Sequence, residues 1–414
     1  MATEDVTREE VARIVKHVCW GSWASRLRSL EQLNDLTPYG RLMRIGLAEA
    51  ECVALVRAAG DRWPASDFDD PRQRLLLCAC QSPHASCFPE ILKVYPRLPD
   101  RSWTRWQALR LLSAMPQREA AEQWVRWYRV EWRAGRGSPP PLDFWPKAGL
   151  HAEVLLPALL EFADTSNMPS PDDWLAERLI EYVVMFFKSS TGRASVTDWA
   201  TRETDRALAA LPAVAERPFS TSRWSDPFRR YKAAQLVTLL GYAGGAKALR
   251  RLKAAVRHDD PRVACAAVGG LIRMGRVAPP AEIDRVASDP DTRRELYDML
   301  RSLKHSRLFP RKWLTQERLA EADMVAWLIA DIDAAPDAVK LLERLDADGG
   351  RYYVFAFRFS PPHSASKDGW MAGISGPWTR RSPNRVEACG GTFSRFEPAD
   401  AFPPAEHLGR NLRR

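Results

Sequence analysis

Residues 259–275 read DDPRVACAAVGGLIRMG, and this stretch predicts an α-helix with a defined start and one closely packed face. Asp260 is suited to cap the helix, because its carboxylate can accept hydrogen bonds from free backbone N–H groups. Pro261 then stands at the first helical position, where no backbone N–H is needed. Small and apolar side chains follow at helical spacing, namely Val263, Ala267, Gly270 and Leu271. We therefore expect a helix that approaches its neighbours closely.

The same Asp-Pro start occurs at three other places, namely Asp70-Pro71, Asp226-Pro227 and Asp289-Pro290. The last three starts, at Asp226, Asp260 and Asp289, follow one another at intervals of about 30 residues, close to the length of one helical hairpin. An arginine stands four residues after the aspartate in three of the four segments: Arg74, Arg230 and Arg293. We expect these arginines to pair with their own aspartate or with that of a neighbouring repeat.

These segments resemble the HEAT-repeat family, in the bacterial form first noted in phycobilin lyases. The residues that carry the resemblance are 259–275 and DPFRRYKAAQLVTLLGYAGG (226–245), with looser matches in DPRQRLLLCAC (70–80) and DPDTRRELYDML (289–300). The good resemblance covers roughly residues 220–305. It implies an all-α fold, a HEAT-like α-solenoid of stacked antiparallel helical hairpins with an extended concave surface. The family's motif specifies the fold and says little about a ligand.

The pattern changes at two places. Residues 133–147, RAGRGSPPPLDFWPK, contain too much Gly and Pro for a continuous helix. After residue 349, YYVFAFRF (352–359) alternates, with Tyr353, Phe355, Phe357 and Phe359 on one face, and 370–375 and 391–396 are two further strand candidates. The sequence thus predicts helical repeats over 1–132, a loop or linker over 133–147, HEAT-like repeats over 148–345, and a small, basic, antiparallel β-rich cap over 349–414. We expect no sheet before residue 345, and the aromatic face should cover the last repeat.

Composition excludes several classes of protein. The chain has 414 residues, of which 45% are hydrophobic and 27% charged, as in ordinary globular proteins. No apolar run approaches the about 18–20 residues of a membrane span, and the polar N-terminus does not resemble a secretory signal. Seven cysteines in so large a chain favour reduced thiols and a cytoplasmic location. The formal net charge of +9 is mild for this length and indicates no class of partner by itself.

Two groups of residues are candidate chemical centres. Cys78, Cys80, His84 and Cys87 carry zinc-binding atoms, but their spacing differs from that of zinc knuckles, and buried structural thiols are the better interpretation. His363 and Asp368 are more readily explained as polar loop residues. The seven histidines are isolated, no His-Glu pair occurs, and no nucleotide-binding loop or G-x-S-x-G motif is present. The sequence therefore predicts no catalytic, cofactor-binding or metal-binding residue.

Two basic groups are the predicted partner-binding residues. Trp124, Trp127, Tyr128 and Trp132 form an aromatic stripe on one predicted helix, and Arg126, Arg129 and Arg133 lie on another face of it. Residues 349–414 hold ten Lys or Arg against five Asp or Glu, including Arg380 and Arg381. A buried aromatic ridge with a solvated basic face, and a solvated basic tail, are the competing structural explanations.

The predicted function is non-enzymatic binding of a protein partner through the solenoid surface, as a scaffold, regulator or immunity-type inhibitor in a bacterial cytoplasm. The alternative is a HEAT-like nucleic-acid-binding protein, similar to alkylpurine DNA glycosylases, that uses the same arginines. No cofactor and no membrane contact are expected. A protein that binds duplex with a steep salt dependence would favour the alternative.

Overall fold

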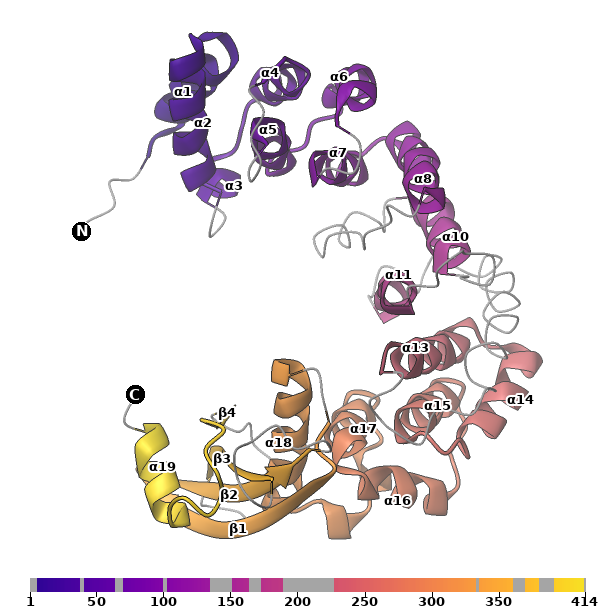
Figure 1. Cartoon of the computed structure of the whole chain (residues 1–414). Helices are drawn as coiled ribbons and strands as arrows, with labels where there is room; N and C mark the ends of the chain where they lie inside the picture. Colours follow the sequence, from indigo (N-terminus) through magenta and orange to yellow (C-terminus); the bar gives the residue numbers. More distant parts are fainter. Residues whose placement is uncertain are drawn as a thin grey trace. The chain divides into compact units, whose positions relative to one another are not determined.

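The computed structural model describes residues 6–37, 41–63, 70–99, 103–134, 151–163, 173–188, 227–332, 335–359, 369–379 and 391–412. The chain is mostly helical, with a small antiparallel sheet toward its C-terminal end (Figure 1). It divides into two compact units, Met1–Val196 and Thr197–Arg414. Most of the predicted loop or linker, residues 135–147, lies outside the described residues. The sheet belongs to the same unit as the helices before it. No helix in these described ranges combines the length and the apolar character needed to cross a bilayer.

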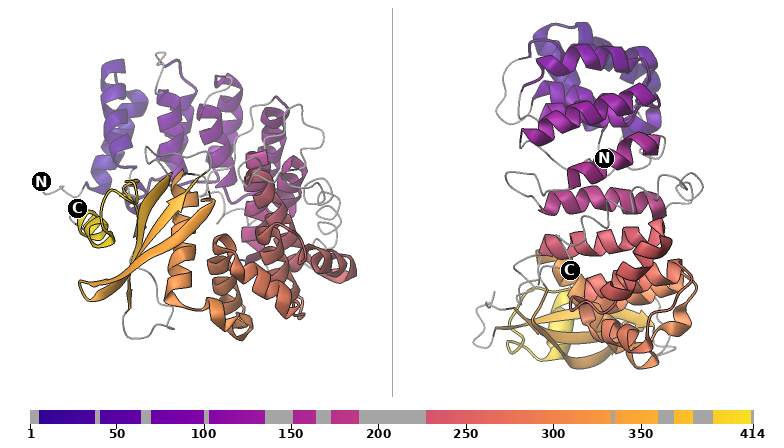
Figure 2. Two further views of the ribbon diagram at one scale, coloured as in Figure 1. Left: turned by 60° about the horizontal axis from the view of Figure 1, so that its bottom comes forward. Right: turned by 90° about the vertical axis from the view of Figure 1, so that its right-hand side faces the viewer.

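Unit 1 consists of helices that pack mainly against their near neighbours in sequence. The pairs in contact include α1 with α2, α4 with α5, α5 with α7, α8 with α10, and α10 with α11. Most of these helices lie roughly parallel or antiparallel to one another (Figure 2). Their bounds are α1 Arg8–Trp20, α2 Trp23–Asp35, α3 Arg41–Ile45, α4 Glu49–Ala59, α5 Pro71–Cys80, α6 Cys87–Val94, α7 Trp103–Ser113, α8 Arg118–Arg133, α10 Ala152–Ala163 and α11 Asp173–Lys188, with a 3-10 turn at Tyr95–Arg97.

In unit 2, the helices α13, α15, α17 and α18 pack one against the next in this order, and α14 and α16 pack beside them (Figure 1). The helix bounds are α13 Pro227–Ala243, α14 Gly245–Ala255, α15 Pro261–Arg273, α16 Pro280–Ser288, α17 Pro290–Ser302, α18 Gln316–Ile332 and α19 Pro404–Leu412. Short 3-10 turns at Ser306–Leu308 and Arg311–Trp313 connect α17 to α18.

The Asp-Pro dipeptides begin helices as predicted. The side chains of Asp70, Asp260 and Asp289 each accept a hydrogen bond from a backbone N–H in the first turn of α5, α15 and α17. Asp226 lies outside the described residues, although α13 begins at Pro227 directly after it. These caps satisfy donors that have no partner within the helix, and they set where each helix starts.

Small residues on α13 and α15 bring the two backbones together. A Cβ atom added to Gly241 would lie 2.4 Å from Cα of Gly270, which no real contact allows. The expectation that Gly270 permits close helix packing is therefore confirmed. The same test at Gly269 places the added atom 2.2 Å from the sulfur of Met299, at the end of a flexible side chain.

The C-terminal sheet has the order β1-β2-β3-β4, and all neighbouring strands are antiparallel. The strands are β1 Ala338–Ala347, β2 Gly350–Arg358, β3 Trp370–Thr379 and β4 Thr392–Phe393. The predicted aromatic face of β2 is buried against α18, where it meets Leu319, Met324 and Leu328. On the opposite face, Leu408 of α19 packs on Val354 and Ile374.

The start of the sheet corrects the predicted boundary. The helical part was expected to reach residue 345, but α18 ends at Ile332 and β1 begins at Ala338. The register of β1 against β2 shifts between Leu341 and Glu343, so one residue interrupts the alternation. Since β1 is also an edge strand with partly exposed side chains, its sequence does not show the two-residue period of a half-buried strand.

The contact between Gly241 and Gly270 yields a stability prediction. Gly241→Ala should lower the free energy of unfolding by about 2 kcal/mol or more, because the methyl group meets backbone atoms that cannot move aside. Urea denaturation measures this difference.

Gly269→Ala is the matched control, since the substitution has the same effect on helix propensity but meets a flexible methionine end. It should change the free energy of unfolding by about 1 kcal/mol or less. Equal effects of the two substitutions would show that the backbones of α13 and α15 do not touch at Gly241.

Candidate functional site

The aromatic stripe of α8 belongs to the core of unit 1. Its buried members are Trp124, Tyr128 and Trp132. The rings of Trp124 and Tyr128 stack with centroids 4.5 Å apart, and Tyr128 also lies 4.9 Å from the ring of Phe162 on α10. The remaining residue, Trp127, stacks on Tyr95 at 3.8 Å. These rings join α8 to its neighbours, so the structural explanation of the stripe holds.

The three predicted arginines of α8 are in different situations. Arg129 donates two hydrogen bonds to the Glu161 carboxylate, at 3.2 and 2.8 Å, and is thereby fixed on α10. Arg126 and Arg133 are exposed. Arg380 and Arg381, the predicted C-terminal pair, lie outside the described residues, as do His363 and Asp368. Arg126 and Arg133 are therefore the exposed members of the predicted group within the described residues.

The cysteine cluster is a set of buried thiols. Cys78 and Cys80 on α5, Cys87 on α6 and Cys52 on α4 are all buried, and none of the six cysteines in the described ranges forms a disulfide. Burial raises the pKa of the Cys78 thiol to about 12, which keeps it protonated and unreactive. A hydrogen bond with Cys52 lowers the pKa of Cys87.

His84 forms a hydrogen bond of 3.1 Å between its Nε2 and the carbonyl of Leu47. Within the described residues, no group of three or more His, Cys, Asp or Glu side chains is arranged to hold a metal ion. His84 thus connects the turn before α6 to the backbone just before α4.

Ion pairs join each helix of the unit 2 row to the next one. Arg230 of α13 pairs with Asp260 at 3.1 Å, and Arg262 of α15 binds both carboxylate oxygens of Asp291, at 2.7 and 2.8 Å. On α17, Arg293 pairs with Glu321 and Arg294 with Asp323, at 2.7 and 3.3 Å. In every pair the arginine and its carboxylate are about 30 residues apart in sequence. We call this set the helix-joining pairs.

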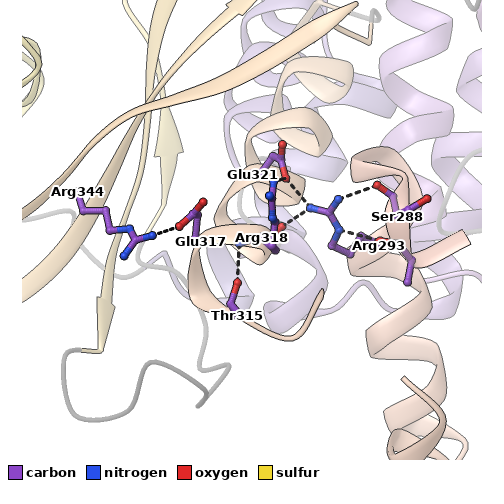
Figure 3. Close-up of polar contacts among 8 residues, drawn as sticks. Ser288, Arg293, Thr315, Glu317, Arg318, Glu321 and Arg344 are labelled. Carbon is purple, nitrogen blue, oxygen red and sulfur yellow. Dashed lines mark hydrogen bonds and ion pairs between the residues drawn. The ribbon is translucent and has the colours of Figure 1, made fainter. Parts of the chain in front are cut away.

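Arg293 is the most constrained of these residues, because its side chain is only 1% exposed (Figure 3). Its Nε and Nη2 donate to the carbonyls of Ala287 and Ser288 at the end of α16, both at 2.8 Å. Its Nη1 donates to the carbonyl of Arg318 and to Glu321, both on α18 and both at 2.7 Å. One guanidinium therefore fixes α16, α17 and α18 together.

The same helix α18 also holds the sheet. Glu317 pairs with Arg344 of β1 (Figure 3). Gln316 donates to the carbonyl of Thr379 at the end of β3, at 2.7 Å, and accepts a hydrogen bond of 3.3 Å from the Tyr353 hydroxyl of β2. These polar contacts supplement the aromatic face and fix the sheet on α18.

Asp323 is unusual among the paired carboxylates. Burial raises the pKa of its carboxyl from 3.8 to about 6, although Arg294 acts in the opposite direction. Arg294 also binds Asp298 at 2.8 Å, and the charge of Asp298 raises the pKa of Asp323 further. The shared arginine therefore does not compensate fully for the buried charge.

A second population of cations in unit 2 lies on α14. Lys247, Arg250 and Lys253 are exposed, as is Arg257 in the turn that follows. In the described part of the chain, Arg250, Lys253 and Arg257 form no ion pair. This contrasts with the helix-joining pairs, whose arginines are each neutralised by a carboxylate.

Most of the exposed large apolar side chains in the described residues belong to unit 1. Nine of them are present in the described residues, and seven belong to unit 1: Trp20, Trp23, Leu27, Met43, Leu92, Trp103 and Val130. The most exposed are Trp20, at 70%, and Trp103, at 66%. Tryptophan in such a position is a frequent anchor of protein–protein interfaces.

Comparison with known proteins identifies no relative of this chain. No family model, no curated protein and no solved structure matches it.

Sequence reasoning found part of this arrangement. The pairing of Arg230 with the aspartate of the following repeat was one of the two expected outcomes and is confirmed. The role of Arg293 was not foreseen, because most of its partners are backbone carbonyls, which no sequence motif reveals. The exposed basic face of α14 was also missed, although the absence of acidic residues from 241 to 258 would have indicated it.

Removal of the Arg293 side chain should be strongly destabilising. Arg293→Met leaves Glu321 and three carbonyls without their buried donor, which should lower the free energy of unfolding by about 3–5 kcal/mol. Urea denaturation of the full chain measures the loss.

The control is Arg301→Met on the same helix, where an exposed arginine reaches Asp298 only at 3.7 Å. It should cost less than about 1 kcal/mol. If Arg293→Met were as mild as the control, Arg293 would not be the joint between the three helices.

The raised pKa of Asp323 predicts a pH dependence. The folded chain binds the proton more tightly than the unfolded chain, so this carboxyl favours folding more as pH falls from about 6 to about 4. Above pH 6 the buried charge weakens the fold. Asp323→Asn should therefore be more favourable at pH 7 than at pH 4 by about 2–3 kcal/mol.

Urea denaturation of both chains at a series of pH values measures this difference. Asp331→Asn, which removes an exposed carboxylate from the same helix, is the control and should give a pH-independent difference. A constant difference for Asp323→Asn would show that its pKa is the same in the folded and unfolded chain.

Proposed function

We propose that this chain is a non-enzymatic, HEAT-like α-solenoid of stacked helical hairpins that binds a protein partner, as a scaffold, regulator or immunity-type inhibitor. The solenoid comprises the helices up to Ile332, and the C-terminal sheet caps its last helix. The observation that carries the proposal is the regular spacing of the helix-joining pairs, whose partners are about 30 residues apart in every case. Such spacing is expected where each repeat contacts the next at equivalent positions.

We propose a protein partner because the buried charged side chains of the described residues join helices, whereas several large apolar side chains are exposed. The buried charged side chains join helices, as Arg293 and Arg262 do in unit 2 and as Glu131 does in unit 1, where it binds Arg105 at 2.8 Å. The exposed tryptophans of unit 1 have the chemistry of interface anchors. A repeat surface that carries such anchors binds an extended partner rather than enclosing a small molecule.

We place the protein in a bacterial cytoplasm, where cysteines remain reduced. The support for this location is the seven cysteines of a chain that is too large to need disulfide bonds for its stability. The alternative, a nucleic-acid-binding protein, relied on Arg126, Arg129, Arg133 and the C-terminal arginines. Of these, Arg129 is paired with Glu161, while Arg126 and Arg133 are exposed.

Partner binding is tested with the tagged full-length chain in cells of its source. We expect one protein to copurify in about equal amount after nuclease treatment and at about 0.3 M salt, where contacts to phosphate are screened. Trp20→Ala and Trp103→Ala should weaken binding of that protein about 30-fold if these residues are hot spots.

Val277→Ala, which truncates an exposed apolar residue of unit 2, is the control and should leave binding unchanged. Absence of any stoichiometric protein, together with turnover of a small molecule by the purified chain, would disprove the proposal.

A further inference from the structure

The helix α14 and the turn after it form the most basic part of unit 2. Residues 245–257 read GAKALRRLKAAVR, with five Lys or Arg and no Asp or Glu. The next acidic residues are Asp259, which is exposed, and Asp260, which is paired with Arg230. The positive charge here is therefore concentrated rather than interspersed with negative charge.

The cations of α14 lie on one side of the helix. Successive residues turn by about 100°, so Lys247, Arg250 and Lys253 lie within about 120° of one another. The face opposite to them is buried through Ala248, Leu252 and Ala255, which contact α13 and α15. We call Lys247, Arg250, Lys253 and Arg257 the basic stripe.

The basic stripe is regular along the helix. Lys247, Arg250 and Lys253 are each three residues apart, which corresponds to steps of about 4.5 Å at 1.5 Å per residue. Arg257 extends the same side by one further turn. A regular line of charge matches a linear polyanion of regular charge, such as a nucleic-acid strand, better than the irregular charges of a folded acidic protein.

Two properties of α14 distinguish between polyanions. A helix that binds a membrane surface inserts apolar side chains between lipids, but Leu252 of α14 is buried and Leu249 is half-buried, so neither is free to insert. Single-stranded nucleic acid is typically held by aromatic stacking, and α14 contains no aromatic residue. Charged contacts without aromatic stacking suit the phosphate backbone of a duplex.

We propose that the basic stripe of α14 binds the phosphate backbone of double-stranded nucleic acid without reading its sequence. The contact is separate from the protein-binding surface proposed for unit 1, and each can fail without the other. Since the arginines of the helix-joining pairs are neutralised, the stripe supplies the charge that attracts the duplex.

A titration of the full-length chain with a fluorescein-labelled DNA duplex of about 20 base pairs tests this proposal. Four phosphate contacts predict a slope of about −3.6 for log Kobs against log salt, which is about a 50-fold loss of affinity between 50 and 150 mM. The variant K247Q/R250Q/K253Q should reduce the slope to about −1, because each lost phosphate contact changes it by about 1.

The matched control is K16Q/R28Q/R41Q, which removes three exposed cations from unit 1 and changes the net charge equally. It should bind within about 2-fold of the original chain. Thermal unfolding should be the same for both variants, because glutamine is a good helix former and all six positions are exposed.

Three results overturn the proposal. The original chain does not bind the duplex at about 50 mM salt, or the α14 variant keeps the steep slope, or the unit 1 control loses affinity to the same extent. An oligoglutamate peptide that binds as tightly as the duplex, with the same dependence on α14, would instead assign the stripe to an acidic protein. Binding to phosphatidylserine vesicles in place of the duplex would assign it to a membrane and likewise contradict the proposal.

Discussion

The structure of unit 2 depends on the hydrogen bonds that satisfy one buried guanidinium group. Arg293 is almost completely buried, and a buried charge is tolerated only when its donors are satisfied. Its acceptors come from the end of α16 and from α18, so these helices must keep fixed positions relative to α17. The sheet depends on the same hydrogen bonds indirectly, through its contacts with α18. Its aromatic face and the contacts of Gln316 are both made with α18, so the position of α18 determines where the sheet lies.

Charge has two separate uses in unit 2. Arginines between helices are matched with carboxylates one repeat away, and they contribute specificity to the order of the helices rather than a large net stability. The cations of α14 lie outside these contacts and remain exposed. A mild net charge for the whole chain therefore conceals a strong local one. Unit 1 differs again, because its exposed tryptophans offer apolar contact area instead of charge.

Local sequence signals predicted what local chemistry controls. An Asp-Pro dipeptide limits the backbone of its own residues, so the starts of α5, α15 and α17 were foreseen. The strand β2 was equally clear, because aromatic side chains recur at every second position on the face that packs on α18. The edge strand β1 was missed, since a register shift breaks its period. Contacts across a repeat were harder to predict. The pairing of Arg129 with Glu161 joins residues 32 positions apart, and sequence alone did not indicate which of many carboxylates Arg129 would contact.

The spacing of the helix-joining pairs has an evolutionary consequence. Each of these arginines reaches a carboxylate at or near the next helix of the row, and its partner is about 30 residues away in the sequence. A genetic duplication of residues 262–291, for example, would carry Arg262 and its partner Asp291 together into both copies. Deletion of such a block would also leave the flanking helices with compatible partners. The row of unit 2 can thus lengthen or shorten by whole blocks while the ion pairs within each block persist.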